Sequence, residues 1–198
     1  MKTIICIGDS LTEGADIPVG HAWPSLTANA LGAKVVNCGI GGDTTQGILS
    51  RLHPEVIALK PDFVFIMGGT NDLWWDWEVK TILGNLFSVV FQARHHGVTP
   101  VIGLPTPVDR PAAERNDFAP PAAGYERFAE KLSDLVLQLS SAAGESDVPV
   151  ADFHAPFLRQ DGGVESGLFL ADGLHPNQEG HRIMAAQTVA LFQETFQF

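Results

Sequence analysis

The sequence is poor in cysteine and has no long hydrophobic run. Its two cysteines, Cys6 and Cys38, lie in or beside expected strands, so we expect two buried thiols and no disulfide framework. The apolar run at residues 2–7 is far too short for a signal peptide or a membrane span. We therefore expect a cytoplasmic protein without a membrane span.

Basic residues are also scarce, with 12 Lys and Arg against 23 Asp and Glu and a net charge of −11. A duplex phosphate backbone or an anionic membrane surface would repel such a chain, so neither is an expected partner. No Gly-Lys-Ser/Thr phosphate loop is present, and Thr44 stands where the third glycine of a dinucleotide fingerprint would be. These absences exclude both common nucleotide-binding loops.

The pattern of apolar residues predicts an α/β fold. The 198 residues, 45% of them hydrophobic, fit one domain spanning residues 1–198 with a sizeable core, and no repeat or low-complexity segment interrupts it. Runs that are apolar on both faces, typical of strands in a covered parallel sheet, occur at residues 3–7, 34–38, 62–67, 100–104 and 148–151. Helical patterns alternate with them at residues 21–31, 44–52, 79–96, 125–139 and 177–192. This alternation predicts a parallel sheet covered by helices on both faces, with strand order 2-1-3-4-5.

Four short motifs stand where expected strands or loops end. They are Gly8-Asp9-Ser10-Leu11, Gly41-Gly42-Asp43, Gly69-Thr70-Asn71-Asp72 and Asp172-Gly173-Leu174-His175. In an open parallel sheet the ligand binds beyond the carboxyl ends of the strands, so the motifs are expected to meet at one edge. Together they contain the groups that an acyl-transfer hydrolase needs.

Each motif suggests a role and has a simpler alternative. Ser10 is the expected nucleophile, although serine is also a common helix cap. Among 7 histidines, His175 is the expected base because Asp172 stands three residues earlier, where it can orient the imidazole; a loop histidine near a capping aspartate is the alternative. Asn71 and Gly42, with the backbone N–H of Ser10, are the expected oxyanion-hole donors, and plain turns are the alternative.

The aspartates beside these groups are assigned a different role. Asp9 and Asp72 each neighbour an expected catalytic residue. We expect both to tie loops together by hydrogen bonds rather than to take part in the reaction.

The four motifs, in this order, resemble the blocks of the SGNH/GDSL hydrolase family of esterases and lipases over residues 8–177. The resemblance assigns the signature positions to Ser10, Gly42, Asn71 and His175, with Asp172 preceding the histidine. It implies a flavodoxin-like three-layer sandwich, no cofactor and no metal, and hydrolysis of a small carboxylic ester through an acyl-serine. The family acts on lipid esters, aryl esters, thioesters and acetylated sugars, so deacetylase and thioesterase activities stay open.

Two other classes of protein are alternatives to an ester hydrolase. A metallophosphoesterase also places Asp, Asn and His at strand ends, but the early Asp-x-His pair is missing and no histidine follows Asn71-Asp72. A binding module without activity would not need every catalytic candidate to be intact. The esterase reading is therefore preferred.

The substrate walls are predicted from two apolar segments. Trp74, Trp75 and Trp77 follow the third motif, and adjacent tryptophans point in different directions, so at least one is expected at the cleft. The proline-rich loop at residues 105–122 carries Val108 and Phe118 and opens at the same edge. Substrate binding is assigned to Trp74, Trp75, Val108 and Phe118, which favours short to medium acyl chains or aryl groups. The oligomeric state is left open.

Overall fold

One parallel sheet organises the computed structural model, which describes all 198 residues. Its strands are β1 (Thr3–Gly8), β2 (Lys34–Gly39), β3 (Phe63–Met67), β4 (Thr99–Leu104) and β5 (Val150–Asp152). They pair in parallel in the order β2-β1-β3-β4-β5, which confirms the predicted order. The last strand begins at Val150 rather than at residue 148, because Pro149 has no N–H to donate to the ladder.

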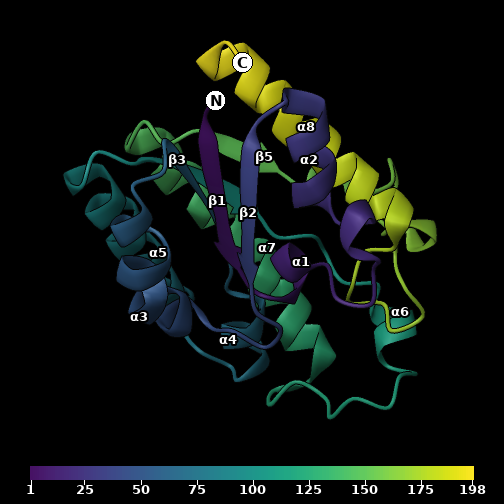
Figure 1. The fold of residues 1–198 in the computed structure, drawn as a ribbon. Coiled ribbons are helices and arrows are strands. Elements are labelled where there is room, and N and C mark those ends of the chain that lie inside the picture. The colour runs from purple at the N-terminus through teal and green to yellow at the C-terminus, as the bar shows by residue number, and fades with distance from the viewer.

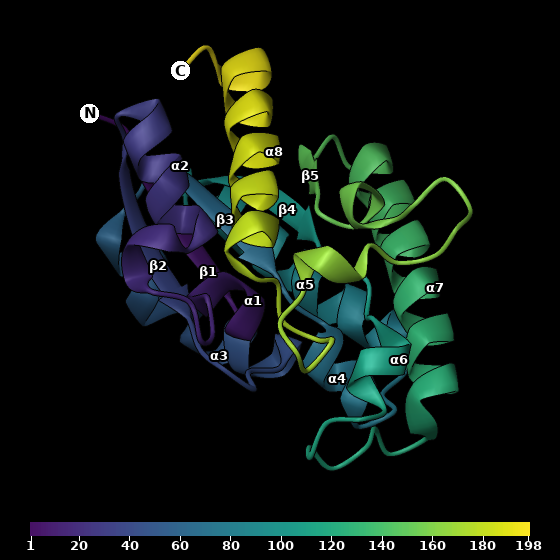
Figure 2. The ribbon, with the colours of Figure 1, turned by 90° about the vertical axis from the view of Figure 1, so that its right-hand side faces the viewer.

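Helices cover both faces of the sheet, as Figures 1 and 2 show. The α-helices are α1 (Ser10–Glu13), α2 (Trp23–Leu31), α3 (Thr45–Glu55), α4 (Thr70–Trp74), α5 (Val79–His95), α6 (Arg110–Ala113), α7 (Gly124–Glu145) and α8 (Gln178–Phe196). Short 3₁₀ turns are η1 (Val19–His21), η2 (Ile57–Leu59), η3 (Ala155–Phe157) and η4 (Ser166–Leu168). Helices α3, α5 and α7 pack on one face, and α2 and α8 pack on the other.

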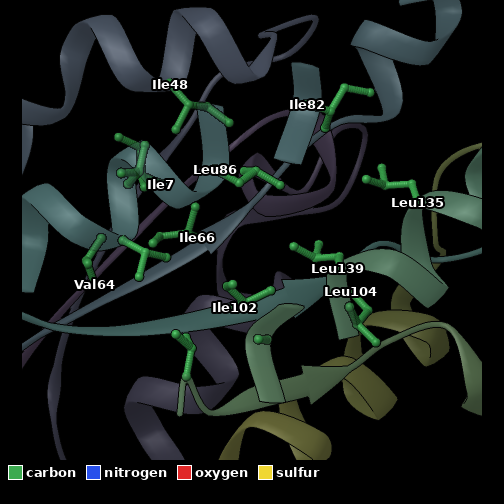
Figure 3. Packing of buried hydrophobic residues seen from close by; sticks show 14 of the residues in the cluster. Ile7, Ile48, Val64, Ile66, Ile82, Leu86, Ile102, Leu104, Leu135 and Leu139 are labelled. Atoms are coloured by element: carbon green, nitrogen blue, oxygen red, sulfur yellow. The ribbon is translucent and has the colours of Figure 1, made fainter. Parts of the chain in front are cut away.

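The strands alternate their side chains between two apolar cores. In β1, Ile5 and Ile7 belong to the core beneath α3, α5 and α7, whereas Ile4 and Cys6 face α2 and α8. Figure 3 shows the first of these cores, in which Ile66 of β3 and its neighbours meet side chains of α3, α5 and α7. Burial on both faces explains why the strands read as unbroken apolar runs.

Several predicted boundaries differ from the structure. The helix expected from residue 21 begins at Trp23, because residues 19–21 form the separate turn η1. The helix expected at residues 44–52 begins at Thr45 and continues to Glu55, and the last helix extends beyond residue 192 to Phe196. The loop at residues 105–122 contains the one-turn helix α6, and the edge strand β2 is only partly buried.

The two cysteines differ in burial. Cys6 is buried and Cys38 is only partly so, which corrects the expectation that both are buried; neither forms a disulfide. Burial raises the pKa of both thiols.

None of the helices combines the length and the apolar character that crossing a membrane would require.

All five strands end at the same edge of the sheet. In Figure 1 this is the lower edge, where α1, α4 and α6 lie, and both chain termini are at the opposite end of the molecule. The loops that follow β1, β2 and β3 carry the first three motifs. This edge therefore contains the candidate site.

Candidate active site

Ser10 lies two residues after the end of β1, at the first position of α1. The Asp9 side chain caps this short helix, because its Oδ1 accepts a hydrogen bond from the Leu11 N–H at 3.0 Å. The Ser10 Oγ lies 3.0 Å from Nε2 of His175. Strand β1 and the Asp9 cap thus hold the serine hydroxyl within hydrogen-bonding distance of an imidazole.

His175 is oriented by Asp172 from the same loop. The Asp172 Oδ2 lies 2.7 Å from Nδ1 of His175, and its Oδ1 accepts the backbone N–H groups of Leu174 and His175. Gly173 between them has φ +68°, and a Cβ there would lie 2.5 Å from the Asp109 carbonyl oxygen. The tight turn that brings the carboxylate back onto the imidazole therefore requires glycine at this position.

The electrostatics of this pair favour a charged imidazole. Burial lowers the pKa of His175, but the hydrogen bond and the charge of Asp172 outweigh it, and with the charges of Asp9 and Asp16 the net pKa lies above the ordinary value. Burial likewise raises the pKa of Asp172, but hydrogen bonds from His175 and from two backbone N–H groups hold it below its usual range. Asp172 is therefore a carboxylate near neutral pH, ready to stabilise an imidazolium.

The three expected oxyanion donors lie together at the cleft. Asn71 is on α4, which begins after Gly69 at φ +117°, where a Cβ would lie 2.7 Å from Leu135. The Asn71 Nδ2 donates one hydrogen to the Asp43 carbonyl oxygen at 2.9 Å, which leaves its second hydrogen for a ligand. The backbone N–H groups of Ser10 and Gly42 donate to no protein acceptor. All three residues line the same cleft.

Asp72 forms the link between α4 and α3. Its carboxylate accepts hydrogen bonds from the backbone N–H of Thr45 and from the Thr45 hydroxyl, at 2.9 Å and 2.5 Å. Burial raises its pKa, although these hydrogen bonds oppose the shift. Asp72 thus makes the loop-tying contact that the sequence suggested.

Asp9 is fully buried and has one unused oxygen. Its Oδ2 has no hydrogen-bond partner, and burial raises its pKa to about 7. Its side-chain hydrogen bond is the local α1 cap, a structural contact that does not tie two loops together as the sequence suggested.

Arg51 of α3 supports the oxyanion side and was not singled out in the sequence. Its Nε bonds the Asp43 carboxylate at 2.7 Å, and its Nη atoms donate to the carbonyl oxygens of Cys38 and Gly8. One guanidinium therefore joins the ends of β1 and β2 to the loop that carries Gly42. The sequence around an arginine on an amphipathic helix does not show whether its side chain makes such contacts or is exposed to solvent.

The cleft above Ser10 is mostly apolar, with a volume of about 570 Å³. Trp74, Trp75, Val108 and Phe118 all line it, as expected from the sequence, whereas Trp77 does not. Trp75 is 65% exposed at the mouth. Trp74 is partly buried, with ring centroids 5.8 Å from Tyr125 and 5.5 Å from Phe128. His175 is the only titratable side chain in the lining.

Other lining residues were not predicted as part of the site. They are Leu11, Ala15, Gly41, Thr70, Thr106, Pro107, Ala119, Phe128, Leu132 and Leu174. Phe128 and Leu132 lie in the helix expected at residues 125–139, and they serve the core and the cleft floor together. The same spacing of four residues marks both roles, so spacing alone does not separate them.

The structure also bears on metal binding. No group of three or more His, Cys, Asp and Glu side chains is arranged as a metal site. Asp9, Asp72 and His175 therefore do not form such a cluster.

Known proteins are similar to this chain in sequence and in fold. The model of the GDSL-like lipase/acylhydrolase family matches residues 6–183. An arylesterase of Vibrio mimicus is 28% identical, over 90% of this chain and 82% of its own length. The thioesterase 1/protease 1/lysophospholipase L1 of Escherichia coli is 26% identical, over 92% and 79%. The crystal structure of the lipase/acylhydrolase from Enterococcus faecalis has a TM-score of 0.80 at 27% identity and covers 98% of this chain and 96% of its own.

Proposed function

Because this chain belongs to the GDSL-like lipase/acylhydrolase family and is a carboxylic ester hydrolase, we propose that it cleaves its substrate through an acyl-enzyme on Ser10. The observation that carries the proposal is the hydrogen-bonded series Ser10–His175–Asp172, whose serine and histidine line the apolar cleft. A serine hydroxyl becomes an effective nucleophile when an oriented base takes its proton. The series supplies the base and its orienting carboxylate.

The acylation step uses each of these groups in turn. His175 Nε2 accepts the Ser10 Oγ proton as Oγ forms a bond to the ester carbonyl carbon. The carbonyl π electrons move to oxygen, and the oxyanion accepts hydrogen bonds from the N–H groups of Ser10, Gly42 and Asn71. The C–O bond to the alcohol then breaks, and the imidazolium protonates the leaving oxygen. The alcohol departs and an acyl-serine remains.

Deacylation repeats these steps with water as the nucleophile. His175 takes a proton from water as the hydroxyl oxygen attacks the acyl carbon, and the same donors bind the second oxyanion. Collapse of this intermediate breaks the bond to Ser10 Oγ, which regains its proton from His175. The products are a carboxylic acid and the free enzyme, and neither step requires a metal or a cofactor.

The substrate we propose is a short to medium acyl ester or an aryl ester. Trp74, Val108 and Phe118 surround the cleft with apolar surface, and no charged carboxylate, lysine or arginine lines it. A net charge of −11 further disfavours an anionic substrate. The names of the relatives include arylesterase and thioesterase, which agrees with an acyl group bound in such a cleft.

A panel of p-nitrophenyl esters graded from acetyl to long acyl chains tests this proposal. We expect kcat/KM to rise to a maximum at short or medium length and then to fall, and to survive exhaustive EDTA treatment. The matching thioesters and an acetylated xylooligosaccharide serve as competing substrates. A maximum for the sugar acetate would assign a deacetylase, and activity lost to EDTA and restored by a divalent ion would contradict the serine mechanism.

A further inference from the structure

Asn116 lies in the loop between α6 and α7, outside every motif described above. Its Nδ2 donates to the backbone carbonyl oxygen of Asp172 at 2.9 Å. Its Oδ1 accepts the backbone N–H of Phe118 at 2.7 Å. One partly buried side chain therefore contacts both the loop that orients His175 and the residue that forms a wall of the cleft.

The same amide lies near Tyr125, which packs against a second wall. Burial raises the pKa of the Tyr125 hydroxyl, and the nearby Asn116 amide opposes this rise. The Tyr125 ring meets Trp74 edge-on, with ring centroids 5.8 Å apart. Trp74 and Phe118 both line the cleft. Asn116 thus joins the Phe118 wall to the Asp172 backbone by hydrogen bonds and lies near the tyrosine that packs on Trp74.

Two further hydrogen bonds show that the loop at residues 105–122 is anchored on either side of Asn116. The Asp109 N–H donates to the Gly173 carbonyl oxygen at 2.8 Å, and the Ala122 N–H donates to the Trp74 carbonyl oxygen at 2.8 Å. Between them, residues 114–121 make one side-chain hydrogen bond to the loop of Asp172, and Asn116 makes it. This segment therefore depends on that amide for its position against the catalytic loop.

We propose that Asn116 is a positioning residue that fixes the orientation of Asp172 toward His175 and, with the same side chain, the position of the Phe118 wall. The proposal rests on the proposed function of Ser10, His175 and Asp172. Without the amide, the Asp172 carbonyl oxygen loses a donor and the turn at Gly173 is held by one contact fewer. The carboxylate then holds the imidazole less closely, and the wall at Phe118 loosens at the same time.

The experiment compares Asn116→Ala with Phe118→Ala on an acetyl ester and on a longer acyl ester. For Asn116→Ala we expect kcat on the acetyl ester to fall about 3- to 10-fold, the range of one neutral hydrogen bond. The acid limb of kcat/KM moves to lower pH, because Asp172 raises the pKa of His175 less effectively. The other carboxylates that act on His175, Asp9 and Asp16, are unchanged. Chain-length preference changes as well.

Phe118→Ala separates the two effects. It removes the wall and keeps the Asn116 side chain, so it changes chain-length preference and leaves the acid limb where the wild type has it. Asp117→Ala is the matched loop control, because this exposed neighbour makes no side-chain hydrogen bond, and it shifts neither property. Thermal unfolding of each variant confirms that the protein measured is folded.

The outcomes distinguish this inference from the function on which it rests. An acid limb and an acetyl-ester kcat equal to those of the wild type in folded Asn116→Ala would overturn the positioning role. An acid-limb shift of the same size in Phe118→Ala would also overturn it, because the wall alone would then account for the effect. Failure of the wild type to hydrolyse any ester in the panel would instead overturn the proposed function.

Discussion

At the scale of single residues, the proposed chemistry depends on donors that are fixed before substrate arrives. Asn71 is held by its hydrogen bond to the Asp43 carbonyl oxygen, and Asp43 is itself bonded to Arg51. Fixed dipoles stabilise a developing oxyanion more effectively than groups that must reorient. Asn71 is therefore expected to act mainly in the transition state.

Asn71→Ala tests this expectation. We expect kcat to fall by about 10²–10³ while KM changes little, because the lost donor acts on the oxyanion and not on the ground-state ester. Asn85→Ala is a matched control, since it also loses a side-chain amide hydrogen bond, to Thr45, but lies outside the cleft. A change confined to KM would make Asn71 a substrate-binding residue instead.

The pKa of His175 predicts the acid limb of the pH profile. The imidazole must be neutral to accept the Ser10 proton, and its pKa is raised above the ordinary value of 6.5. Activity is therefore present above this raised pKa and is lost as pH falls through it. We expect the midpoint of the acid limb of kcat/KM to lie above pH 6.5, with kcat strongly reduced in Asp172→Asn. A midpoint well below pH 6.5 in the wild type would contradict the arrangement.

At the scale of elements, α4 and the loop at residues 105–122 define the cleft walls. Each CH₂ of an acyl chain buried there contributes about 0.8 kcal/mol, or roughly a 4-fold gain in kcat/KM. Trp74 lies against Phe128 at the cleft floor, whereas Trp75 is at the exposed mouth. Trp74 is therefore expected to influence chain length more than Trp75.

Trp74→Ala and Trp75→Ala, measured on the graded ester panel, test these walls. We expect Trp74→Ala to move the optimum by a larger step than Trp75→Ala, while both variants still react at Ser10. A third variant with residues 108–119 shortened removes the opposite wall. The same chain-length profile in all three variants would show that specificity is determined elsewhere.

The elements also show which features the sequence could predict. The five strands could be located because burial on both faces leaves an unbroken apolar run, and the order followed from right-handed crossovers. The one-turn helices α1, α4 and α6 were not predicted, because four or five residues carry no detectable helical period. They are stabilised by caps such as Asp9 and by tertiary contacts, which no local pattern reports.

In the candidate site too, some residues could be predicted from the sequence and others could not. Ser10, Asn71, Asp172 and His175 stand in short motifs whose order was informative, and the structure brings them to one edge. Arg51 and Asn116 act through backbone carbonyls that are distant in sequence, so their contacts exist only after folding. Residues of this kind could not be found without the fold.

At the scale of the whole molecule, one buried histidine links stability to pH. His181 at the start of α8 accepts the Trp23 backbone N–H through its Nδ1, so it joins α8 to α2 as a neutral imidazole. Burial, with a smaller contribution from the charge of His175, lowers its pKa to about 4. The unfolded chain binds a proton more readily than the folded protein between about pH 6.5 and pH 4. The contribution of neutral His181 to the stability of the folded protein is complete above pH 6.5 and is lost as pH falls through this range.

Unfolding free energies measured from pH 7 to pH 4 test this linkage. The wild type is expected to lose up to about 3 kcal/mol through His181 over this range. His181→Asn keeps an acceptor oxygen for the Trp23 N–H and removes the titration, so its stability should depend less steeply on pH. Parallel curves for the two proteins would show that other groups account for acid unfolding.

The most direct test of the central claim is the reaction of Ser10 with a fluorophosphonate, followed by intact mass and peptide mapping. This reagent forms a covalent adduct with a serine whose hydroxyl has been activated by a base. The account predicts one adduct per chain, located on Ser10, and no adduct in Ser10→Ala, with kcat of that variant reduced by several orders of magnitude although it remains folded. An adduct on another residue, or near-normal ester turnover by folded Ser10→Ala, would contradict the account.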